Sequence, residues 1–172
     1  MPLLTDYDWR SKYDPDDGTL IEQFYLTALA CAQRYDRTTG YFSATALAIA
    51  ARGIEGLVLN AGRMRMVVGC TLGQPEVDAI EQGQSLKDTV AGMLLAMPLV
   101  GTSKGEKEAL ELLAWMVAKG HLEIKVAVPC DENRNPVTSN AIFHEKAGVI
   151  EDKTGNRLAF AGSVNETAYG WL

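Results

Sequence analysis

The stretch "AIFHEKAGVIEDKTGNRLAFAG", residues 141–162, decides the fold class of this chain. Residues 141–152 predict a strand, the turn residues of "KTGN" follow, and "RLAFAG" predicts a second strand. A short turn between two such segments allows the strands to pair side by side. We therefore expect a β-hairpin near the C-terminal end of the sequence.

Upstream of the hairpin, predicted helices alternate with predicted strands. Capping boxes at Thr19–Glu22 and Ser103–Glu106 each open a helix, and Gly62 and Gly120 each end one. The predicted helices cover residues 20–35, 44–62, 75–83, 87–97 and 106–120, and the predicted strands cover residues 37–43, 63–70 and 122–129. Strands separated by helices favour parallel pairing through helical crossovers. With the hairpin, the pattern predicts an α/β fold whose mixed β-sheet is flanked by helices.

Length and charge limit the classes of function. The 172 residues suit an N-terminal arm, residues 1–17, followed by one domain, residues 18–172. The net charge of −6 argues against a broadly basic surface, so a site for a polyanion must be a local positive cleft or borrow charge from another domain or subunit. No apolar run is long enough to span a bilayer, and the acidic N-terminus is unlike a signal peptide. We expect a cytoplasmic protein without a membrane partner.

The three cysteines give no sign of a metal or redox site. Cys31, Cys70 and Cys130 are scattered, and no two have the spacing of a zinc motif. We expect free thiols in or near the core, and we expect neither a metal ion nor a cofactor.

The predicted hairpin carries a group of residues suited to phosphate. Side chains alternate across a strand, so His144, Lys146 and Gly148 share one face. The opposite face, with Phe143, Glu145, Ala147 and Val149, is expected to be mostly core. Two potentially cationic groups side by side are unfavourable unless an anion compensates them, and a phosphate would do so. Ser163 and Asn165 follow the second strand, and pairing of the hairpin would bring them near His144.

These residues also carry a resemblance to a known family. "HEK" at 144–146 followed by "GSVN" at 162–165 resembles the HxK…GSxN signature of the phospholipase D superfamily. "TTGYFS" at 38–43 resembles the strand that often opens such domains, and the sequence from about residue 35 to its end looks like the phospholipase D-like nuclease domains fused in front of bacterial superfamily-two helicases. The resemblance implies a phospholipase D-like fold and a C-terminal helicase region in a longer protein.

The same resemblance assigns roles to individual residues. It implies that His144 attacks phosphorus to form a phosphohistidine, while Lys146, Ser163 and Asn165 hold the phosphate oxygens. Glu151 falls at the position where the family carries aspartate, and the gap before "GS" is longer here. The implied function is a metal-independent phosphodiesterase, specifically a nuclease that acts on DNA.

A symmetric homodimer follows as an expectation, because the leaving oxygen needs a second proton donor. Enzymes of the superfamily use two HxK motifs, and this chain has one. His121 is the only other histidine, and its place after a helix end suggests a surface residue. A two-fold axis would bring a second His144 to the first.

Other interpretations stay open. The chain could be a catalytically inactive phospholipase D-like module for dimerisation or DNA targeting of a helicase, which the replacement of aspartate by Glu151 favours. Hydrolysis of a lipid headgroup ranks lower, because no amphipathic helix rich in Lys and Arg is present. Arg63 and Arg65 are either solvated or in contact with a nucleic-acid backbone, and Trp115 is either core or a dimer contact.

Overall fold

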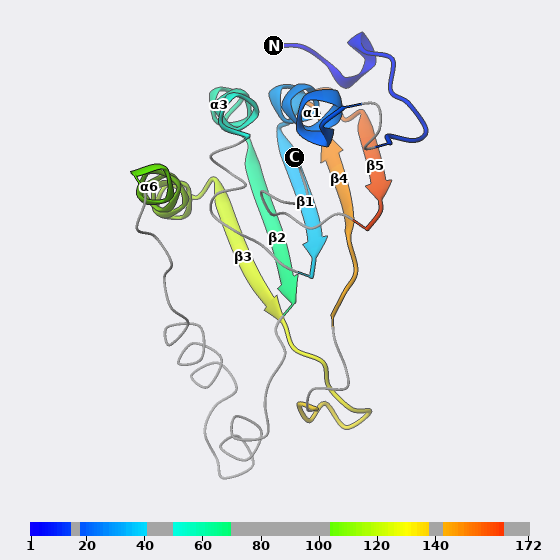
Figure 1. Cartoon of the computed structure of the whole chain (residues 1–172), viewed down its shortest axis with the longest axis vertical. Helices are drawn as coiled ribbons and strands as arrows, with labels where there is room; N and C mark the ends of the chain where they lie inside the picture. Colours follow the sequence, from blue (N-terminus) through cyan, green and yellow to red (C-terminus); the bar gives the residue numbers. More distant parts are fainter. Residues whose placement is uncertain (15–17, 41–49, 70–103, 138–142, 164–172) are drawn as a thin grey trace.

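A five-stranded mixed sheet forms the centre of the computed structural model, which describes residues 1–14, 18–40, 50–69, 104–137 and 143–163 (Figure 1). The strands are β1 (Arg34–Thr39), β2 (Arg63–Gly69), β3 (Leu122–Ala127), β4 (Ala147–Glu151) and β5 (Arg157–Ala161), in the order β3-β2-β1-β4-β5. β1 pairs with β2 and β2 with β3 in parallel, whereas β4 pairs antiparallel with β1 and β5. The predicted α/β class, the mixed sheet and the C-terminal hairpin are confirmed.

The described helices pack around this sheet. They are a short 3-10 turn (Leu4–Asp6), a π-helical turn (Ile21–Tyr25), α1 (Leu26–Cys31), α3 (Ala51–Leu59) and α6 (Lys104–Ala118). The two helices predicted over residues 75–83 and 87–97 lie outside the described residues. No helix in the described ranges is long and apolar enough to cross a membrane.

The first predicted helix is too long at its C-terminal end. Helix α1 ends at Cys31, because Ala32 has an extended backbone conformation, and strand β1 begins at Arg34 instead of residue 37. Arg34 pairs with both Arg63 and Glu151, and the Tyr35 side chain is completely buried. Residues 34–36 form strand and not helix because pairing with strands on two sides satisfies their backbone groups and buries Tyr35 at the same time.

Helix α3 ends earlier than its predicted stop at Gly62. Its last residue is Leu59, and Ala61 takes the left-handed conformation with φ of 52°. The Gly62 N–H donates to the carbonyl of Leu57 at 2.8 Å. Asn60 fixes this helix end, since its side-chain amide donates to the carbonyls of Ala30 and Ala32, each at 3.0 Å.

The core lies on one face of the sheet, beneath the N-terminal helices. Tyr35 and Ile150 from the sheet are fully buried, as are Leu29 and Leu57 from α1 and α3. The predicted arm is tied to this core, because Leu4 is buried and its N–H donates to Asp152 at 2.9 Å. The N-terminal residues therefore contribute directly to the packing of the sheet.

Candidate functional site

The predicted site lies at the edge of the sheet where the parallel strands end. β1, β2, β3 and β5 all run toward this edge, which is the lower one in Figure 1, and β4 starts from it. The predicted strand over residues 141–152 is shorter in the structure, so His144 and Lys146 lie in the extended segment just before β4. This carboxyl edge is where ligands bind in many α/β sheets.

The loop after β5 starts beside the His–Lys segment. Ala147 pairs with Ala161, and the Gly162 N–H then donates to the carbonyl of Lys146 at 3.0 Å. This bond extends the hairpin by one step past the last paired residues, and the exposed Ser163 comes next. The structure therefore brings Ser163 to the same edge as His144 and Lys146. Asn165 lies outside the described residues.

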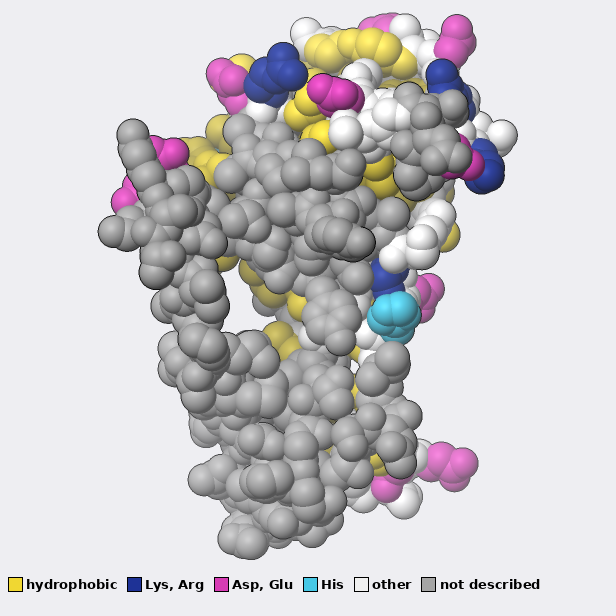
Figure 2. Space-filling model, viewed as in Figure 1, with side chains coloured by type: hydrophobic (Ala, Val, Ile, Leu, Met, Phe, Trp, Pro, Cys, Tyr) yellow, Lys and Arg dark blue, Asp and Glu magenta, His cyan; other side chains and the backbone are white. Residues whose placement is uncertain are grey.

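His144 and Lys146 have different environments. His144 is exposed, and a histidine lies next to a Lys or Arg side chain on the face drawn in Figure 2. Lys146 is only 4% exposed, and its ammonium group donates to the carbonyl of His144 at 2.9 Å. Burial lowers the pKa of the Lys146 ammonium, and the nearby positive charge of Arg37 lowers that pKa further.

The two faces of this segment are the reverse of the prediction. Lys146, Gly148 and Ile150 point into the covered face of the sheet, whereas Val149 is 37% exposed and Glu145 is exposed. The predicted core face is wrong because the N-terminal helices cover the side on which Ile150 lies. Both faces carry apolar residues, so local sequence could not distinguish them.

The space beside Gly148 is used by the protein itself. A Cβ atom at this position would lie 2.4 Å from Cζ of Phe160, far inside van der Waals contact. The absence of a side chain lets the Phe160 ring lie across β4, where it also packs edge-on against Phe24, with ring centroids 4.9 Å apart. Gly148 therefore makes room for an aromatic core residue and not for a ligand.

Glu151 is not brought to His144. It lies at the far end of β4, where its carboxylate accepts a hydrogen bond from Arg157 at 2.6 Å. Glu151 is seven positions from His144 along extended chain, roughly 23 Å at about 3.3 Å per residue. This carboxylate therefore acts on the hairpin turn and lies too far away to orient the imidazole.

His121 lies at the opposite edge of the sheet from His144. It precedes β3, with Nδ1 2.8 Å from the carbonyl oxygen of Gly62, and its ring stacks on Trp115 with centroids 5.5 Å apart. Trp115 is 42% exposed, so it is not a core residue. Because β1, β2 and β3 are parallel, the start of β3 and the carboxyl edge are a full strand length apart. His121 of the same chain therefore cannot meet His144 at one phosphate.

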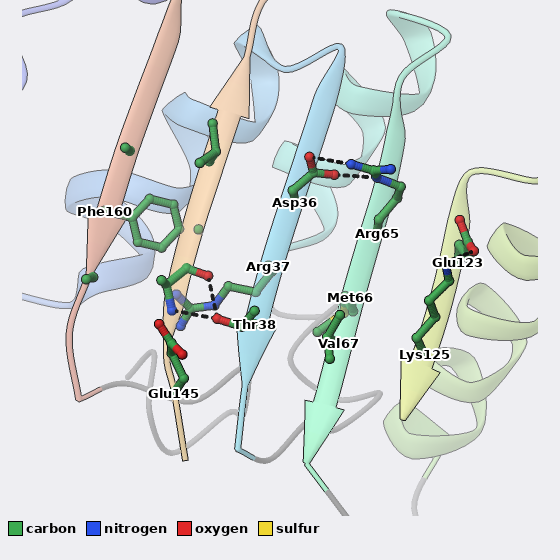
Figure 3. Close-up of a pocket in the computed structure, with 15 residues that line it drawn as sticks. Asp36, Arg37, Thr38, Arg65, Met66, Val67, Glu123, Lys125, Glu145 and Phe160 are labelled. Carbon is green, nitrogen blue, oxygen red and sulfur yellow. Dashed lines mark hydrogen bonds and ion pairs between the residues drawn. The ribbon is translucent and has the colours of Figure 1, made fainter. Parts of the chain in front are cut away.

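An open hollow extends over the other face of the sheet, and Arg37, Gly148 and Phe160 also border it. Figure 3 shows its lining, which includes Asp36 and Arg65, paired at 2.6 Å, together with Glu123 and Lys125 from β3. The hydrogen bond from Arg65 lowers the pKa of Asp36 against the opposing effect of burial. Since opposite charges neutralise each other here, the described residues of this face give no concentration of positive charge suited to a polyanion. Arg65 is exposed, as expected of a solvated residue, and it also pairs with Asp36.

The described cysteines and acidic residues offer no assembled metal site. In the described parts of the chain, no three His, Cys, Asp or Glu side chains are close enough to hold a metal ion. Cys31 is fully buried, and burial raises the pKa of its thiol to about 11. Cys130 is exposed, contrary to the expectation of a thiol in or near the core, and Cys70 lies outside the described residues.

One residue of this edge was missed by the sequence analysis. Arg37 lies on the covered face of β1, is 4% exposed, and is close enough for its charge to act on Lys146. A single arginine near the start of a predicted strand looks like an ordinary surface charge. Its alternation with the buried Tyr35 and Thr39 was the signal that could have revealed it.

Comparison with known proteins gives a structural likeness and no sequence match. No protein-family model matches the sequence, and no curated protein matches it. The solved structure of NucT from Helicobacter pylori is similar over 88% of this chain and 70% of its own chain, with 14% sequence identity and a TM-score of 0.43. Because this similarity is low, the functional argument depends on the residues of the site.

Proposed function

We propose that this chain is a phosphodiesterase domain of the phospholipase D type, a metal-independent nuclease that acts on DNA. His144 attacks the phosphorus atom, the bond to one ester oxygen breaks, and a phosphohistidine forms. Water then attacks the same phosphorus atom and releases His144. Lys146, Ser163 and Asn165 hold the non-bridging oxygens and stabilise the charge that develops on them.

The hydrogen bond from the Gly162 N–H to the Lys146 carbonyl supports this proposal most directly. The motifs "HEK" and "GSVN" are separated by 15 residues, and this bond joins Gly162, the first residue of "GSVN", to Lys146, the last residue of "HEK". An exposed imidazole, a buried ammonium group and an exposed hydroxyl are thereby collected within one small region. Nucleophile, fixed cation and hydroxyl donor are the parts that phosphoryl transfer through histidine requires.

The proposal includes a symmetric homodimer, because the leaving oxygen needs a proton. A histidine with a pKa near ~6.5 suits this task at neutral pH. His121 lies at the opposite edge of the sheet, so we propose that His144 of a second copy supplies the proton across a two-fold axis. Co-refolded heterodimers of wild-type and His144→Ala subunits should then lack normal turnover. Heterodimers with half the wild-type rate would contradict a shared site.

The central experiment compares the two histidines. We expect His144→Ala to abolish cleavage of bis(p-nitrophenyl) phosphate and single-stranded DNA in EDTA, while His121→Ala retains activity. Circular dichroism provides the folding control for both variants. A covalent adduct that is labile in acid and stable in base should accumulate on wild-type protein quenched during turnover and be absent from His144→Ala.

Two results would reject the proposed mechanism. Full activity in folded His144→Ala would remove His144 as the nucleophile. Loss of wild-type activity in EDTA, with recovery on addition of magnesium or zinc, would replace the phosphohistidine route with a metal-dependent one.

One contact favours the alternative of an inactive targeting or dimerisation module. The Lys146 ammonium group is directed at a backbone carbonyl, 2.9 Å away, and is almost fully buried. A lysine whose ammonium group makes only this contact would stabilise the backbone of the segment and would not bind phosphate. DNA binding or dimerisation that persists in His144→Ala, with no cleavage by the wild-type protein, would select this alternative.

A further inference from the structure

Arg37 takes part in a row of residues that crosses three strands. Arg37 on β1 is paired with Gly148 on β4, and Gly148 is paired with Phe160 on β5. Because Gly148 has no side chain, the two outer residues meet above it, and the guanidinium carbon lies 5.0 Å from the centre of the Phe160 ring. Figure 3 shows Arg37 extending from β1 toward β4 and Phe160.

Lys146 lies one step from this row toward the carboxyl edge. It precedes Gly148 by two residues and shares its face, so about 7 Å of extended chain separates the two positions. Arg37 and Lys146 are each 4% exposed. Two buried cations from adjacent strands therefore lie next to each other directly behind the exposed His144.

The nearby acidic residue does not enter this pair. Glu145 stands between His144 and Lys146 in the sequence, but it is exposed, and alternation along the segment places its side chain on the other face from Lys146. Side-chain alternation thus places the cations on one face and the carboxylate on the other. The lowered pKa of Lys146 agrees with this arrangement, since burial and the charge of Arg37 both disfavour its ammonium form.

An arginine at this position differs from a lysine in its permanent charge and its planar shape. A guanidinium keeps its charge at any ordinary pH, and its flat face suits an aromatic ring. The contact with Phe160 holds Arg37 in the row, so its charge is fixed while the more exposed groups at the edge contact the substrate. The charge of Arg37 disfavours the ammonium form of Lys146, and a bound anion at the edge favours it.

We infer that Arg37 is a positioning residue of the phosphate site: its guanidinium, fixed over Phe160 across Gly148, supplies permanent positive charge behind Lys146 and strengthens the binding of a phosphate group at His144. This inference rests on the proposed function, because it concerns the same site. It adds a residue from β1, more than 100 positions away in the sequence from the His–Lys segment.

The test separates the charge of Arg37 from its packing. Arg37→Met keeps an unbranched side chain over Phe160 without charge, and Arg37→Lys keeps the charge. Inorganic phosphate is the probe, and isothermal titration at low, constant salt gives its affinity. We expect Arg37→Met to weaken phosphate binding on the order of tenfold, and Arg37→Lys to stay within about threefold of wild type. Arg65→Met is the matched control, since it removes an arginine from the opposite face, and its affinity should not change.

The outcomes distinguish this inference from the proposed function. If wild type binds phosphate and cleaves diesters, but Arg37→Met binds phosphate as wild type does, the inference is wrong and the proposed function stands. Equal losses in Arg37→Met and Arg37→Lys would assign Arg37 to packing alone. If folded wild type neither binds phosphate nor cleaves diesters, both are wrong.

Folding of the variants is checked by circular dichroism. Arg37→Gln serves as a second neutral variant should Arg37→Met fail to fold. If neither neutral variant folds, Arg37→Lys decides alone, and a folded Arg37→Lys with affinity more than about tenfold below wild type would overturn the role of the charge.

Discussion

The two ends of the β4–β5 hairpin hold buried charges of opposite sign, in different environments. At the turn, Asp152 is 2% exposed and accepts five hydrogen bonds, from Leu4, Thr154 and Asn156. At the open end, the buried Lys146 donates to a carbonyl and lies next to the cationic Arg37. One end of the hairpin thus satisfies a buried anion within the chain, and the other gathers buried cations.

This difference separates stability from function within one small motif. Hydrogen bonds to a buried carboxylate stabilise the native state, and their loss leaves polar groups unsatisfied. Adjacent buried cations destabilise the folded protein, and a bound anion reduces this destabilisation. Substitutions at the turn should therefore change the free energy of unfolding, whereas substitutions at the open end should change activity.

The largest effect is expected from Lys146→Met. Loss of the cation should reduce phosphodiesterase kcat/KM by about 10²- to 10³-fold, the range seen when one charge-stabilising donor is removed. The free energy of unfolding should stay within about 1 kcal/mol of wild type or rise, since an apolar side chain suits the buried place. Denaturant titration and diester hydrolysis give the two quantities. The control is Lys153→Met, which removes an exposed lysine of the turn and should change neither quantity. A strongly destabilised Lys146→Met would contradict the separation of stability at the turn from activity at the open end.

Asp152→Ala should show the opposite pattern. Removing the carboxylate frees backbone and side-chain donors of the turn and the Leu4 N–H, so we expect a loss of about 2–4 kcal/mol in the free energy of unfolding. Activity per folded molecule should be unchanged, because the site lies at the other end of the strand.

The chain offers a matched control for Asp152. Asp131 accepts hydrogen bonds from the N–H groups of Asn133 and Asn135, as Asp152 does from Thr154 and Asn156, but Asp131 is exposed and does not hold the N-terminal segment. Asp131→Ala should therefore destabilise the protein clearly less than Asp152→Ala. Equal losses would show that the turn alone, without burial and Leu4, accounts for the stabilisation.

The turn should also show a defined pH dependence. Burial by itself raises the pKa of Asp152, but hydrogen bonds from Asn156, Leu4 and Thr154 outweigh burial and hold the pKa below the ordinary 3.8. The unfolded chain then binds this proton more tightly than the native state, so the stabilisation is complete above about pH 5 and decreases as pH falls below about 4. The difference in unfolding free energy between wild type and Asp152→Asn, measured from pH 7 to pH 3, should shrink on acidification. A constant difference would contradict the lowered pKa.

The smallest effects concern the backbone of the two aspartate loops. Arg134 and Gly155 occupy equivalent positions and have φ of 66° and 85°. A residue with a Cβ is strained there, so Arg134→Gly should stabilise the protein by up to about 1 kcal/mol, and Gly155→Ala should destabilise it by about 1 kcal/mol. Thermal unfolding of both variants measures the difference, and shifts of the same sign would contradict equivalent loops.

Sequence by itself determined two of the parallel strands and the hairpin pairing that builds the candidate site. The segments at 63–69 and 122–127 are strands, and "KTGN" joins two antiparallel strands, because alternation and turn chemistry are local properties. From the hairpin alone, His144, Lys146 and Ser163 were expected at one edge, and the structure brings them there. The order in which strands and helices alternate was likewise sufficient to predict the mixed sheet.

Only the tertiary structure decided which side of the hairpin is covered, where β1 begins, and which residues stand behind the site. Tyr35 fits the apolar pattern of the preceding helix as well as that of a strand, and both faces of residues 143–150 carry apolar side chains. Arg37 meets Lys146 and Phe160 only because β1, β4 and β5 become neighbours across a bare Gly148. Alternation along a strand fixes which residues share a face, but contacts between segments more than 100 residues apart determine which face the helices bury.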